Sequence, residues 1–190
     1  WRCLGYVYHL GIKDYEKALN YYEKSLEVDS TYVDAINSKA NIYVEQKKYD
    51  LAIKEYSKGI LLKEIDPNGA AYCYGNRAEQ YERLRQFDKA LADYDSAIVL
   101  EPENAVRYEY RAWFYYAQKE YNKSRFDFTR AKELDPDNPK RWYNLGYVYH
   151  KGPKDYEKAL EYYQKSLELD STYVFSINSS ANIYVKQKKF

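Results

Sequence analysis

Two distant stretches of the chain are near copies of each other. Residues 1–49 and 142–190 share 37 of 49 residues at an offset of 141 positions. Between them, a small residue followed three positions later by a tyrosine recurs every 34 to 38 residues. A period of this length is typical of chains that stack similar supersecondary units, because each unit buries its apolar face only against its neighbours. The repetition therefore predicts a stacked array rather than a single globule.

Each repeat carries two spaced pairs of residues, and both spacings are helical. The first pairs lie three positions apart: Gly5/Tyr8, Ala40/Tyr43, Ala78/Tyr81, Ala112/Tyr115, Gly146/Tyr149 and Ala181/Tyr184. The second pairs lie four positions apart: Ala18/Tyr22, Ala52/Tyr56, Ala90/Tyr94, Ser124/Phe128 and Ala159/Tyr163. Residues three or four positions apart share one face of a helix. Each repeat is therefore predicted to contain two short amphipathic helices, called here the first and the second helix.

The register divides the chain into one array of five helix pairs and one extra helix. The repeats span about 1–32, 33–70, 71–104, 105–138 and 139–173, with a partial repeat at 174–190. Extra residues around 63–65 are expected to lengthen the second helix of the second repeat. Gly11 and Gly152 are expected to end first helices in the left-handed conformation, after which Asp14 and Asp155 cap the second helices.

The repeat pattern resembles the tetratricopeptide repeat family across essentially the whole chain. The residues that match its motif are Trp142, Leu145, Gly146, Tyr149, Ala159 and Tyr163, and also Trp1, Leu4, Gly5, Tyr8, Ala18 and Tyr22. The resemblance implies an all-α fold, an α-solenoid of helix-turn-helix repeats wound into a right-handed superhelix. It also implies that the first helices line a concave groove in which ligands of the family lie. The longer turns at Gly11 and Gly152 are similar to those of the related Sel1-like repeats.

Helical spacing around each small residue predicts which side chains line this groove. The candidate partner-binding residues are Tyr6, Asn37, Asn41, Tyr72, Asn76, Glu79, Tyr110, Trp113, Tyr116, Tyr143, Asn144, Tyr147, Asn178 and Asn182. The aromatic members favour an interface, because Trp and Tyr are enriched among residues that dominate binding energy. The alternative is that these rings pack on one another and only thicken the wall.

The asparagines of this set suggest a row of amides that could hold an extended peptide backbone, since an amide both donates and accepts hydrogen bonds. Their alternative is an exposed, solvated helix face. His9 and His150 are expected to be polar residues of the same wall. The carboxylate clamp of some family members is incomplete here: Asn76 fits, but Asn37, Val106 and Tyr110 stand where cations belong.

Composition excludes several classes of function. Thirty Lys and Arg nearly balance 29 Asp and Glu, which provides no net attraction to nucleic acid or to an anionic membrane. Two isolated cysteines favour a reducing, cytoplasmic setting. No metal ligand set, cofactor motif or catalytic constellation is visible, so we expect no cofactor and no enzymatic activity. The chain begins inside a motif and lacks Met, as expected for a piece of a longer protein.

The function predicted from these features is a scaffold or adaptor that binds a peptide or a partner helix in the groove. One alternative is a structural array that self-associates by head-to-tail stacking of its ends, because the last helix around Ile177, Ala181 and Tyr184 lacks a covering second helix. Another alternative is the regulatory arm of an enzyme whose catalytic domain lies outside this chain.

Overall fold

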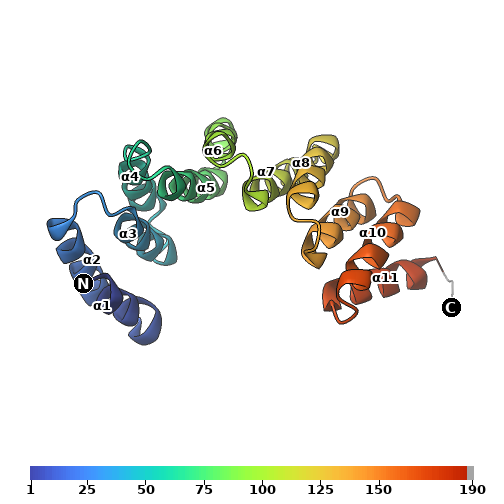
Figure 1. Ribbon diagram of the computed structural model, residues 1–190, viewed down its shortest axis with the longest axis horizontal. Coiled ribbons are helices and arrows are strands. Elements are labelled where there is room, and N and C mark those ends of the chain that lie inside the picture. Colours follow the sequence, from blue (N-terminus) through green and yellow to red (C-terminus); the bar gives the residue numbers. More distant parts are fainter. Residues whose placement is uncertain (188–190) are drawn as a thin grey trace. The chain divides into compact units, whose positions relative to one another are not determined.

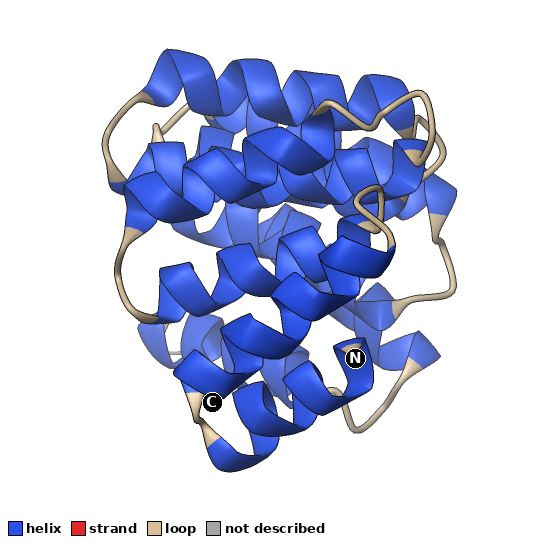
Figure 2. Ribbon diagram, turned by 90° about the vertical axis from the view of Figure 1, so that its left-hand side faces the viewer, coloured by secondary structure: helices blue, strands red, loops and turns tan. Residues whose placement is uncertain are grey.

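The computed structural model describes residues 1–187, so the last three residues of the predicted repeat at 174–190 lie outside the described residues. Helices and loops make up this part of the chain (Figure 2). It divides into two compact units, the first comprising residues 1–102 and the second beginning at Glu103. The prediction of an all-α solenoid of helix-turn-helix repeats is confirmed.

The first unit contains six α-helices and one π-helix, and helices adjacent in sequence pack on each other (Figure 1). They are α1 (Arg2–Tyr6), η1 (Val7–Ile12), α2 (Tyr15–Val28), α3 (Val33–Glu45), α4 (Tyr49–Ile60), α5 (Pro67–Arg83) and α6 (Phe87–Leu100). The second unit contains α7 (Ala105–Ala117), α8 (Tyr121–Leu134), α9 (Pro139–Lys151), α10 (Tyr156–Leu169) and α11 (Val174–Lys186).

The predicted small and aromatic pairs of the second helices form the core of each hairpin. All five pairs are buried, and Ala18, Tyr22, Ala159 and Tyr163 are fully inaccessible. The aromatic ring of the second helix packs directly over the small residue of the first. A Cβ added to Gly5 would lie 2.5 Å from the ring of Tyr22. The repeat motif therefore records a close approach between the two helices.

In both the third and the fourth repeat, an ion pair joins the first helix to the second helix of the same repeat. The two pairs lie at equivalent positions. Arg77 donates from Nε and Nη2 to the two carboxylate oxygens of Asp93, both at 2.8 Å. Arg111 makes the same two 2.8 Å bonds to Asp127, whose side chain is 1% exposed. In the fifth repeat these positions hold an apolar pair, since Leu145 is buried and Tyr162 packs against its cluster.

The predicted caps of the second helices are confirmed. Asp14 accepts from the backbone N–H of Lys17 at 3.1 Å, and Asp155 accepts from that of Lys158 at 3.2 Å. The prediction that Gly11 and Gly152 adopt the left-handed conformation is wrong, because no glycine of the described residues has positive φ.

Five cationic residues occupy the left-handed position instead, one in each intra-repeat turn: Lys13, Lys47, Arg85, Lys119 and Lys154. Each turn closes with a backbone bond back to a tyrosine of the first helix, for example from Glu120 N to Tyr115 O at 2.9 Å. In the second, third and fourth repeats this bond spans five residues, as in a Schellman motif. In the first and fifth repeats, whose turns have one extra residue, it spans six. In all five turns the left-handed residue directly precedes the donor, whatever its side chain. In the first repeat, Gly11 lies within π-helix η1. In the fifth, Gly152 provides room for the ring of Tyr121.

The extra residues around 63–65 do not lengthen the second helix of the second repeat, so that prediction is wrong. Helix α4 ends at Ile60, and residues 61–65 form turns. The extra length appears in α5, which begins at Pro67 and has 17 residues. Asp66 explains this start, because its side chain accepts from Gly69 N at 2.9 Å and a proline follows in the first turn.

Candidate functional site

A cluster of half-buried aromatic side chains lies on α7 and α9 of the second unit. We call it the aromatic face, and its members are Tyr110, Trp113, Tyr116, Tyr143 and Tyr147. The Trp113 ring centroid lies 5.6 Å from those of both Tyr116 and Tyr147. Tyr147 also lies 5.7 Å from Tyr116 and 5.9 Å from Tyr143. The structure therefore brings Trp113, Tyr116, Tyr143 and Tyr147, from two adjacent repeats, together.

The aromatic face is anchored on the core beneath it. Trp113 meets Phe128 edge to face at 4.9 Å, and Tyr143 stacks on Tyr163 at 5.6 Å. Edge-to-face and offset arrangements are the favourable geometries for aromatic pairs. Mutual packing of the rings is thus present. Each member nevertheless remains only half-buried, which leaves part of each ring accessible.

Burial affects the acidity of the tyrosines on this face. Burial and the adjacent Tyr147 raise the pKa of Tyr116 to about 12. Burial also raises the pKa of Tyr143. Both hydroxyls therefore stay protonated at neutral pH and remain able to donate hydrogen bonds.

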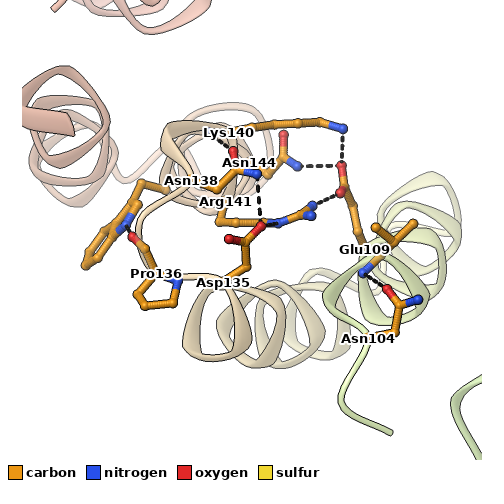
Figure 3. A network of polar contacts seen from close by, with 10 residues as sticks. Asn104, Glu109, Asp135, Pro136, Asn138, Lys140, Arg141 and Asn144 are labelled. Carbon is orange, nitrogen blue, oxygen red and sulfur yellow. Dashed lines mark hydrogen bonds and ion pairs between the residues drawn. The ribbon is translucent and has the colours of Figure 1, made fainter. Parts of the chain in front are cut away.

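A buried carboxylate ties the two helices of this face together, as Figure 3 shows. Glu109 on α7 is 4% exposed and accepts hydrogen bonds from three side chains of α9. Lys140 Nζ lies 2.8 Å from Oε1, Asn144 Nδ2 lies 2.9 Å from the same oxygen, and Arg141 binds Oε2. Asp135 accepts from Arg141 Nε at 3.0 Å. These contacts compensate the negative charge of Glu109 and hold α9 against α7.

The predicted row of asparagines is not uniform in the structure. Asn37 and Asn144 are buried at 6% and 2% exposure. The Sγ of Cys73 lies 3.0 Å from Asn37 Oδ1, so both amides join neighbouring first helices. Asn41 is half-buried and accepts from the Tyr56 hydroxyl at 2.5 Å. Asn76 is half-buried with an unbonded Nδ2.

The remaining predicted site residues divide between the two units. In the first unit Tyr6 and Tyr72 are exposed, at 57% and 42%. Glu79 is half-buried, and burial raises its pKa although Arg83 acts in the opposite direction. In the second unit Asn178 and Asn182 are exposed on α11.

Neither histidine is an exposed wall residue, so that expectation is wrong. His9 and His150 are 5% and 2% exposed, each enclosed edge to face by two tyrosines of the following helix. These surroundings were not predicted from the sequence. The sequence does contain one indication of a difference between the two sites. Glu45 of the first copy corresponds to Lys186 of the second, and this is the one position at which the charge is reversed between the copies.

Residues 1–187 contain no group of three or more His, Cys, Asp or Glu side chains arranged to hold a metal ion. No helix in the same range has both the length and the apolar character that crossing a membrane requires.

Known proteins resemble parts of the chain in sequence. It is 36% identical over 96 residues to Protein STIP1 homolog of Dictyostelium discoideum, which covers 49% of this chain and 17% of that protein. It is 38% identical over 79 residues to human serine/threonine-protein phosphatase 5, covering 42% of this chain and 15% of that protein. The chain thus spans less than a fifth of either relative.

Solved structures share the fold over most of the chain. Yeast Tom70 matches with a TM-score of 0.75 at 19% identity, over 91% of this chain and 36% of that one. YrrB, described as a TPR protein with an unusual peptide-binding site, matches with a TM-score of 0.66 at 20% identity, over 95% and 90% of the two chains.

Family models locate the repeats within the chain. A tetratricopeptide repeat model matches residues 4–32 and 33–66, and a TPR repeat model matches residues 114–152. A Sel1 repeat model matches residues 143–171, in the copy that contains the longer turn at Gly152. The tetratricopeptide models together cover more than half of the chain. The chain therefore belongs to the tetratricopeptide repeat family.

Proposed function

We propose that this chain is a protein-interaction module that binds a peptide or a helix of a partner on the aromatic face. The observation that carries the proposal is the interlocked set of half-buried rings on α7 and α9. Rings held by one another and by Phe128 lose little conformational entropy on binding, and Tyr and Trp are the side chains that most often dominate binding energy.

The relatives are consistent with this role. Hsp70-Hsp90 organizing protein 3 of Arabidopsis thaliana is 31% identical over 91 residues, and its name describes an organiser of two other proteins. The structurally similar YrrB has a peptide-binding site. Binding of a protein segment is therefore the function that best fits both the face and the family.

A peptide-display selection on the whole chain tests the proposal. Peptides enriched on the unmodified protein are then measured against Tyr147→Ala and Tyr149→Ala. Tyr149 is the matched control, because it is a half-buried tyrosine of the same helix whose ring stacks on Tyr162, which is not a member of the aromatic face. We expect Tyr147→Ala to weaken binding by about 2 kcal/mol, roughly thirtyfold, and Tyr149→Ala to leave it unchanged. Equal losses, or no enriched peptide, would count against this face.

Self-association is the second candidate, favoured by exposed apolar residues on the first and last helices. Ala181 and Tyr184 are exposed on α11, whereas the equivalent Ala40 is buried against α4. Leu4 is 44% exposed on α1, whereas the equivalent Leu145 is buried with Phe128 of α8.

Both end faces thus correspond to surfaces that a second helix covers elsewhere in the chain. Head-to-tail stacking of two copies would bury the exposed face of α11 in one copy against that of α1 in the other. Sedimentation velocity across a concentration series tests this, since a monomer at every concentration would exclude self-association.

A further inference from the structure

In the first copy of the duplicated segment, His9 and Tyr15 contact a carboxylate of the same chain. Glu45, the last residue of α3, accepts from the Tyr15 hydroxyl at 2.7 Å and lies 3.0 Å from His9 Nε2. Burial raises the pKa of Glu45, but the hydrogen bonds from Tyr15 and His9 outweigh burial and hold the pKa below its usual value. This donor pair therefore stabilises an ionised carboxylate, one oxygen on each donor.

The second copy keeps the donors and lacks the carboxylate. His150 is enclosed by Tyr156 and Tyr163 at 5.7 and 6.2 Å, close to the 6.0 and 6.3 Å of the first copy. Its Nδ1 lies 3.2 Å from the Tyr163 hydroxyl. Its Nε2 is buried and has no hydrogen-bond partner among the described residues. The place of Glu45 is taken by Lys186.

The charges around His150 have changed in the direction that attracts an anion. Two residues of the first copy, Leu10 and Glu45, are replaced by Lys151 and Lys186. Burial, followed by these two lysines, lowers the pKa of His150 to about 4. The ring is therefore neutral at pH 7. In the first copy Nε2 of His9 must donate, because the ionised Glu45 carboxylate can only accept. The same tautomer at His150 has Nδ1 accepting from the Tyr163 hydroxyl and places the ring proton on Nε2, which is the unbonded atom.

We propose that His150, Tyr156 and Lys186 form a binding site for a carboxylate group of a partner polypeptide. The imidazole Nε2 and the Tyr156 hydroxyl take the two oxygens, as their counterparts do with Glu45, and the Lys186 ammonium supplies the counter-charge. An unpaired donor that is buried is costly, and a charge-assisted hydrogen bond is the strongest way to satisfy it. Lys186 is exposed at the end of α11, so its side chain can make way for the ligand.

This site uses other residues than the carboxylate clamp of the family, whose positions correspond here to Asn37, Asn76, Val106 and Tyr110. Its residues are not members of the aromatic face, although Tyr163 contacts both His150 and Tyr143. Acetate binding therefore tests it even if the aromatic face binds nothing.

The chain contains only two histidines, which makes ¹⁵N-histidine NMR a direct test with an internal control. Sodium acetate is titrated at pH 7.5 and constant ionic strength, with sodium chloride as the reference salt. We expect a saturable change in the Nε2 shift of His150 with acetate alone. His9 should not respond, because Glu45 already occupies its Nε2. No saturable change at His150, an equal change with chloride, or equal responses of both histidines would overturn the proposal.

Reciprocal exchanges test the assignment of residues. Lys186→Glu places an internal carboxylate in the second copy and should weaken acetate binding by roughly tenfold or more, while raising the pKa of His150. Lys165→Glu, an exposed lysine further along α10, is the charge-matched control and should change neither. Glu45→Lys should make His9 responsive. If Glu45→Lys fails to fold by circular dichroism, the Lys186 and Lys165 variants still decide the question.

Two peptides identify the source of the carboxylate. One has an internal glutamate and an amidated C-terminus, and the other has no acidic residue and a free C-terminus. A response to the first alone assigns the site to acidic side chains, and a response to the second alone assigns it to chain ends. A response to both supports the proposal for either source. Acetate binding without a response to either peptide would exclude a polypeptide ligand.

Discussion

Loss of the Asp127 carboxylate should strongly destabilise the second unit. Asp127 accepts two 2.8 Å hydrogen bonds from Arg111, and the two side chains are 1% and 18% exposed. Removing one partner of a buried ion pair costs about 3–5 kcal/mol, because the other charge stays buried without compensation. Partial exposure of Arg111 lets water reach the guanidinium. We therefore expect Asp127→Ala to cost about 3 kcal/mol, the lower end of that range.

Thermal unfolding followed by circular dichroism measures this loss. In a chain of this size 1 kcal/mol shifts Tm by about 2–4 °C, so Asp127→Ala should lower Tm by about 6–12 °C. Asp137→Ala is the control, because Asp137 is exposed in the turn before α9 and should change stability by less than about 0.5 kcal/mol.

A double variant separates the ion pair from the packing. Arg111→Leu with Asp127→Tyr copies the apolar pair that the fifth repeat uses at these positions, Leu145 and Tyr162. Replacing a buried ion pair by packed apolar residues is often neutral. We expect the double variant to recover most of the loss. The uncompensated-charge explanation is refuted if Asp127→Ala lowers Tm no more than Asp137→Ala does, or if the double variant is less stable than the single one.

Three further predictions concern backbone conformation, packing and pH. Lys119→Gly should raise stability by up to about 1 kcal/mol in denaturant unfolding, because Lys119 has a φ of 62° and glycine adopts this conformation without strain. Gly146→Ala should cost about 1–2 kcal/mol, since its Cβ would lie 2.9 Å from the Tyr163 ring. Gly11→Ala, with nothing within 4 Å, should not destabilise. The pKa of His150 falls from 6.5 to about 4 on folding, so the unfolded chain binds the proton more tightly. Stability should therefore decrease as pH falls through this interval, by up to about 3 kcal/mol, and His150→Gln should flatten the decrease in a pH series of denaturation midpoints.

The helices, their core pairs and their caps could be predicted because each depends on residues within one repeat. The position of Tyr163 over Gly146, for example, follows from local spacing alone. The residues with left-handed backbone conformation could not be predicted. Their positions depend on the hydrogen bond that closes each turn and not on the residue type. The preference of glycine for positive φ therefore led to a prediction at Gly152, whereas Lys154 is the residue that adopts the left-handed conformation.

The candidate site was predictable only in part. The rings of Trp113 and Tyr147 were expected on one face, and the structure brings them together. The burial of Asn144 was not predicted, because it depends on a hydrogen bond to Glu109 in the preceding repeat. A side chain that completes a contact between repeats has no signature within its own repeat. Only comparison of the two copies, as with Glu45 and Lys186, reveals that its surroundings differ.

The contacts of Glu109 bear on how the repeats open. In a linear array each repeat contacts only its neighbours. The stability of the interface between two adjacent repeats, called here a junction, therefore decides whether they unfold together. Glu109 crosses one such junction with hydrogen bonds to Lys140, Arg141 and Asn144. Amide protons of α7 and α9 should consequently exchange with solvent as one cooperative unit. Glu109→Gln should let the fifth repeat open first, while α7 remains protected.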